Sequence, residues 1–75
     1  MTWTLIKGIE FEWLNYQGEV EHRRMLPKTW DWYINDQAPK GAWFISGFDY
    51  DRGIAPEFAR RSFDISRVSN IRTMT

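Results

Sequence analysis

The sequence has no cysteine, no net charge and no long hydrophobic run, and each absence excludes a class of protein. A chain without cysteine forms neither a disulfide nor a thiolate metal site, so we expect a reducing, cytoplasmic location. The first residues lack the basic and apolar segments of a signal peptide, and no run approaches a membrane span, so no membrane partner is expected. Ten basic residues balance ten acidic ones, which disfavours a broad positive surface for nucleic acid.

Aromatic residues are abundant instead: the 75 residues include five Trp, five Phe and three Tyr. A chain this short, without cross-links, needs a dense core or a partner to be stable. We therefore expect a single domain over residues 1–75, in which the aromatic residues of the strands form the core. These are Phe11, Trp13, Trp43, Phe48 and Phe63.

Apolar and polar residues alternate at the start of the chain, which predicts strands rather than helices. Most odd positions from Trp3 to Trp13 are apolar, and Asn15 to Gly18 has the residues of a tight turn. A returning strand is expected over residues 19–26, ended by proline at position 27. We expect Val20 and Leu26 to face the core, and Arg24, which has the same parity, to face it with them.

The remaining segments predict an all-β fold. Residues 28–41 contain several turn formers and indicate a long loop, whereas 64–68 predicts a short helical turn capped by Asp64 or Ser66. A helix over 56–62 is the alternative to a strand there. Five short strands favour a small bent sheet or barrel. The last three strands are expected over residues 42–50, 58–63 and 69–75.

Four sequence features occur in the order and approximate spacing of a WYL domain, which the chain therefore resembles over about residues 9–70. The features are Gly18, Arg23-Arg24 with Pro27, Trp43-Phe44-Ile45, and the run from Arg61 to Val68. The resemblance implies an Sm-like, SH3-type five-stranded barrel that senses ligands or binds nucleic acid. The chain resembles the short, stand-alone WYL-like proteins of phages and mobile elements.

The resemblance also implies which residues contact a ligand. Phe44 stands where the family has tyrosine, between Trp43 and Ile45, which match the motif. Arg61, Phe63, Arg67 and Val68 match the terminal motif, although Asp64 occupies a position where the family often has arginine.

Arginines are the strongest functional candidates. Residues 58–75 contain four arginines and one aspartate, and arginine suits phosphate and carboxylate ligands. We predict a non-catalytic regulatory module that binds an anionic ligand, a nucleic acid or nucleotide, through an arginine-lined face. The predicted ligand-binding residues are Arg24, Phe44, Arg61, Phe63 and Arg67. The alternative is that the arginines pair with glutamates on neighbouring strands.

Three aromatic residues in the expected loop, Trp30, Trp32 and Tyr33, cannot all point inward from one strand. They predict either a lid that completes the core or a partner-binding site. The second hypothesis gives an alternative function, in which a phage or mobile-element protein inhibits or modulates a host defence or regulatory protein. A homodimer or higher homo-oligomer is compatible with each function.

No catalytic, metal or cofactor site is predicted. His22 is the only histidine, and no serine, cysteine or second histidine is arranged around it as in a catalytic triad. Asp49 and Asp51 share a strand face but flank a turn, which favours a capping role over metal binding.

Overall fold

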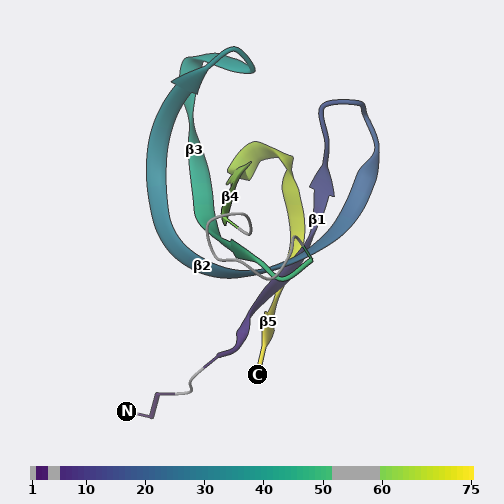
Figure 1. The fold of residues 1–75 in the computed structure, drawn as a ribbon, viewed down its shortest axis with the longest axis vertical. Helices are drawn as coiled ribbons and strands as arrows, with labels where there is room; N and C mark the ends of the chain where they lie inside the picture. Colours follow the sequence, from purple (N-terminus) through teal and green to yellow (C-terminus); the bar gives the residue numbers. More distant parts are fainter. Residues whose placement is uncertain (1, 4–5, 52–59) are drawn as a thin grey trace.

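Five antiparallel strands form one sheet in the order β4-β3-β2-β1-β5 in a computed structural model, which describes residues 2–3, 6–51 and 60–75. The predicted all-β fold is confirmed, and Figure 1 shows that β2 and β3 curve together as a long arc. The edge strands β4 and β5 do not pair with each other in the described part of the chain, so a closed barrel is not confirmed. The elements are β1 (Gly8–Leu14), β2 (Val20–Asn35), β3 (Ala38–Asp49), β4 (Arg60–Asp64), η1 (Ile65–Arg67) and β5 (Val68–Met74).

The predicted turn between β1 and β2 is confirmed. The Asn15 side-chain oxygen accepts hydrogen bonds from the backbone amides of Gln17, at 3.0 Å, and Glu19, at 2.8 Å. Gly18 has a φ of 83°, a conformation that glycine adopts without strain. This turn sets Trp13 opposite Glu21, so odd-numbered residues of both strands share a face.

The predicted orientation of the first half of β2 is wrong by one residue. Met25 is fully buried, whereas Val20 is 65% exposed. Cross-strand partners share a face, and Phe11, in the core, is opposite Arg23. Arg23 therefore faces the core, and Arg24 faces outward.

The predicted loop over residues 28–41 is instead a hairpin of β2 and β3, joined at Asp36 and Gln37. The Asn35 side chain caps this turn by accepting from the amides of Gln37 and Ala38, both at 2.9 Å. Pro27 does not end β2, because the register shifts between Pro27 and Thr29 and the missing amide proton falls at a bulge.

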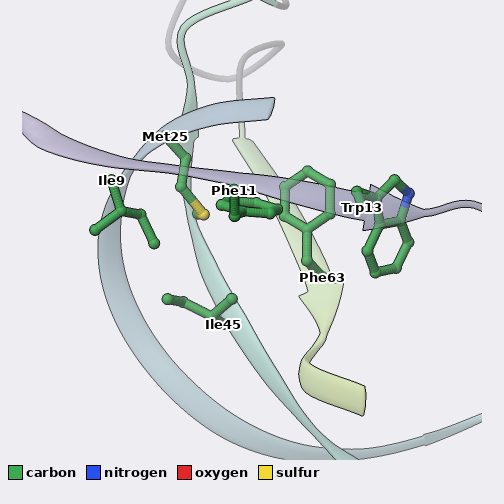
Figure 2. Close-up of a cluster of buried hydrophobic side chains, with 6 residues drawn as sticks. All are labelled: Ile9, Phe11, Trp13, Met25, Ile45 and Phe63. Atoms are coloured by element: carbon green, nitrogen blue, oxygen red, sulfur yellow. The ribbon is translucent and has the colours of Figure 1, made fainter. Parts of the chain in front are cut away.

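The core lies on one face of the sheet, as Figure 2 shows. Phe63 is fully buried, with its ring centroid 5.1 Å from that of Phe11 and 4.9 Å from that of Trp13, in edge-to-face geometry. Such pairs add to the stabilisation that burial provides. The core prediction is confirmed for these three residues and wrong for Trp43, which is 54% exposed, while Phe48 is partly buried. The cluster consists of Ile9, Phe11, Trp13, Met25, Ile45 and Phe63.

The end of the chain follows the prediction closely. Asp64 caps η1, accepting from the amide of Ser66 at 2.9 Å, and β5 follows directly. Residues 60–62 belong to β4, so the alternative helix is wrong there, and positions 56–59 lie outside the described residues. Within the described residues, the structure contains no helix with the length and apolarity to cross a membrane.

Candidate functional site

The five predicted ligand-binding residues do not form a single site. Arg24 lies on the outer face, where its Nη2 atom donates to Asp51 Oδ1 at 2.5 Å. This hydrogen bond lowers the pKa of Asp51 and raises the pKa of Arg24. Arg24 is thus paired with a carboxylate away from the core.

Arg67 holds the turn between β1 and β2. Its Nη1 atom donates to the carbonyl oxygens of Leu14 and Asn15, both at 3.1 Å. Its guanidinium carbon lies 4.5 Å from the ring centroid of Tyr16. These contacts connect η1 to the first hairpin and give Arg67 a structural role.

Phe44 is buried on the face of β3 opposite the core. Its cross-strand neighbours are Asp31 and Asp64, and its ring meets that of Tyr33 edge-on at 5.5 Å. Phe44 and Tyr33 help to line an open cavity of about 410 Å³ whose lining carries no charged side chain.

Arg61 and Phe63 do lie together, and Arg23 joins them. The guanidinium carbon of Arg61 is 5.1 Å from the Phe63 ring centroid, and that of Arg23 is 5.9 Å from the same centroid. Both arginines border a pocket of about 250 Å³ between the first turn and β4. Its lining residues are Trp13, Asn15, Tyr16, Gln17, Glu21, Arg23 and Arg61.

The charge of Arg23 is compensated by two carboxylates. Its Nη2 atom pairs with Asp49, whose side chain has no exposed surface, and its Nη1 atom lies 3.3 Å from Glu21. Asn15 orients Glu21 by donating to its second oxygen at 2.9 Å. Sequence reasoning missed Arg23 because it assigned the opposite parity to β2.

Arg61 is electrostatically different from Arg23. No carboxylate among residues 2–3, 6–51 and 60–75 forms an ion pair with it. Its guanidinium lies against the Phe63 ring, and the edge-to-face pair of Trp13 and Tyr16 provides an apolar wall of the pocket. The pocket can therefore hold an anionic group beside a flat or apolar one.

Three tryptophans form a second candidate surface. Trp30 pairs with Ile45 across the hairpin, and Trp32 pairs with Trp43, so all three indoles lie on one face of the sheet. We call Trp30, Trp32 and Trp43 the tryptophan face; they are 57%, 53% and 54% exposed. Tyr33, 44% exposed, lies on the opposite face, so the predicted aromatic trio is divided.

Two of the three tryptophans, Trp32 and Trp43, lie where the sheet is only two strands wide. β1 pairs with β2 no further than Met25, and β4 pairs with β3 only over residues 44–48. Beyond the pair of Asp31 with Phe44, the described hairpin has no third strand beside it. Sequence reasoning placed Trp43 in the core instead of on this surface, because the exposure of Trp43 depends on where the neighbouring strands end.

The chain matches no family model, and no curated protein or solved structure is detectably similar to it. Among the described residues there is also no group of three or more histidine or carboxylate side chains placed to hold a metal ion.

Proposed function

We propose that the protein is a non-catalytic binding module that holds a small anionic ligand, such as a nucleotide, in the pocket beside Arg61. One observation carries the proposal: the Arg61 guanidinium lies against Phe63 at the border of a pocket with no described carboxylate paired to it. A WYL-like, Sm-type barrel that acts in the cytoplasm is the context we propose for it. The curled five-stranded sheet and the Arg61-to-Val68 motif support this context.

The size of the pocket favours a compact ligand over a long strand. Its volume, about 250 Å³, is near the lower end of ligand pockets, which begin at about 300 Å³. A phosphate at Arg61 with part of a base against Trp13 or Tyr16 fits this volume. The zero net charge of the chain argues in the same direction, because extended strands are held by many cations.

Isothermal titration with adenosine monophosphate and with inorganic phosphate tests the proposal. Arg61→Gln keeps a polar side chain but removes the charge, and we expect at least about a tenfold loss of affinity. The matched control is Arg72→Gln on β5, whose side chain is 70% exposed and which should leave affinity unchanged. Equal affinity of Arg61→Gln and the wild type, or no binding of either probe, would contradict the proposal.

A second variant, Glu21→Gln, should change the affinity for phosphate in the opposite direction. Glu21 lines the same pocket, so its negative charge repels an anion held by Arg61. In Glu21→Gln, Arg23 keeps Asp49 as its partner, and we expect the wild-type fold with tighter phosphate binding. Weaker binding in this variant would show that the anion does not lie in the pocket.

The exposure of Trp30 and Trp32 supports a second candidate function, in which a phage or mobile-element protein modulates a host protein. Capture of one stoichiometric host protein, lost on Trp32→Ala but retained on Trp3→Ala, is the expected result. Trp3 is a suitable control because it is 86% exposed and lies outside the sheet.

A further inference from the structure

The tryptophan face needs an explanation that the pocket does not supply. Two-stranded hairpins are marginally stable in water unless another surface packs on them. With about 250 Å² for a whole Trp side chain, the three indoles together expose on the order of 400 Å². A patch of this size on a small protein often marks an interaction site.

We propose that a second copy of this chain covers the tryptophan face, in a symmetric dimer in which Trp30, Trp32 and Trp43 pack against the same residues of the other copy. This inference goes beyond the proposed function and does not depend on it. The pocket is lined by the first turn, β1, β2 and β4, whereas the tryptophan face belongs to the far half of the second hairpin.

The charge distribution fits a second copy better than it fits a nucleic acid. The two cross-strand pairs of the face, Trp30 with Ile45 and Trp32 with Trp43, contain no charged residue. A symmetric contact between such faces brings no like charges together, and the chain itself has zero net charge. Stacked bases would need cations beside the indoles to hold the phosphates.

The surface area supports the same conclusion. The chain exposes 5680 Å², against about 4,850 Å² for a compact monomer of its mass. This excess of roughly 800 Å² belongs to the whole chain, and the three indoles expose on the order of 400 Å², about half of what each partner contributes to a standard interface. The radius of gyration, 13.0 Å, also exceeds the value of about 11 Å for a compact chain of this length.

Sedimentation equilibrium on the whole chain, from about 1 μM to about 1 mM, tests the dimer. For the wild type we expect an average mass that rises with concentration toward twice that of the chain. Trp30→Glu and Trp30→Lys each leave the internal pair of Trp32 and Trp43 intact, and each should weaken association at least about tenfold. Trp3→Glu, the matched control, should associate like the wild type.

A mixture of the two Trp30 variants sharpens the test. Across a symmetric contact, glutamate from one copy meets lysine from the other, so the mixture should associate more strongly than either variant alone. Circular dichroism shows whether each variant keeps its sheet. A wild type that stays monomeric up to about 1 mM would overturn the proposal without any variant. Capture of a different protein by a monomeric chain would overturn the dimer proposal as well. Neither result would change the nucleotide titration, which tests the pocket beside Arg61 separately.

Discussion

The ion pair of Arg23 with Asp49 gives a stability prediction whose size follows from burial. The Asp49 side chain has no exposed surface, and that of Arg23 is 15% exposed. Asp49→Ala removes one partner and leaves a largely buried guanidinium with Glu21 alone, 3.3 Å away. Breaking a buried pair costs about 3–5 kcal/mol, and the remaining contact with Glu21 favours the lower value, about 3 kcal/mol. A domain of this length has about 4–11 kcal/mol in total.

Thermal and urea denaturation followed by tryptophan fluorescence measure this loss. A cost of about 3 kcal/mol lowers the melting temperature by about 12–24 °C in a domain of this size. Replacing both partners, as Arg23→Met with Asp49→Leu, leaves no buried charge unpaired. The double variant should be more stable than either single variant, with a coupling free energy of about 2 kcal/mol or more.

Two results would refute this reasoning. Asp49→Ala that costs less than about 1 kcal/mol would show that the carboxylate does not compensate a desolvated charge. Strictly additive costs in the double variant would show that the two side chains do not interact. Asp36→Ala, at the exposed second turn, is the control and should change stability by less than about 0.5 kcal/mol.

Two further predictions concern the second hairpin and the outer ion pair. A Cβ atom at Gly47 would collide with the backbone carbonyl oxygen of Leu26. Gly47→Ala should therefore lower the free energy of unfolding, measured by urea denaturation, by about 2 kcal/mol or more. Wild-type stability of this variant would contradict the close approach of β2 to β3. The hydrogen bond from Arg24 lowers the pKa of Asp51 below its ordinary value of 3.8. The pair therefore stabilises the fold above that pH, and its contribution is lost as pH falls through the lowered pKa. Melting temperatures of wild type and Asp51→Asn should differ at neutral pH and converge in acid, whereas parallel profiles would exclude the linkage.

The strand content was predictable because alternation and turn residues are local signals. The orientation of β2 was not predicted. Val20 and Leu26 give the even-numbered positions a stronger hydrophobic pattern than Met25 gives the odd-numbered ones, yet the odd-numbered positions face the core. The pairing of Trp13 with Glu21 determines the orientation, and pairing depends on the length of the turn. The apolar residues of the returning strand carry less information than the number of residues in the turn before it.

The second hairpin was missed for a different reason. Turn-forming residues around the Asp36 turn and Pro39 indicated a loop, and Pro27 indicated a strand end. In the structure, cross-strand partners such as Trp32 and Trp43 outweigh these local preferences, and the bulge accommodates the proline. Such long-range pairing leaves no pattern within either segment alone.

The candidate site was predicted only where its residues are close in sequence. Arg61 and Phe63 are two positions apart on one strand, so their common face followed from alternation. Arg23 reaches the same pocket from β2, and Trp13 and Tyr16 reach it from β1 and the turn. Their convergence depends on the curvature of the sheet, which composition and periodicity do not encode.

The bulge between Pro27 and Thr29 keeps both halves of β2 on a common face of the sheet although the parity changes. Odd-numbered residues up to Pro27 share the face of Met25, whereas beyond the bulge the even-numbered Trp30 and Trp32 lie on that face, because β2 uses one more residue than β3 at that point. The partners Ile45 and Trp43 keep one parity on β3, and Ile45 belongs to the core. Deletion of Lys28 would therefore remove the bulge and leave the tryptophans opposite the same partners, so the length of β2 at this point can change in evolution without exchanging its two faces.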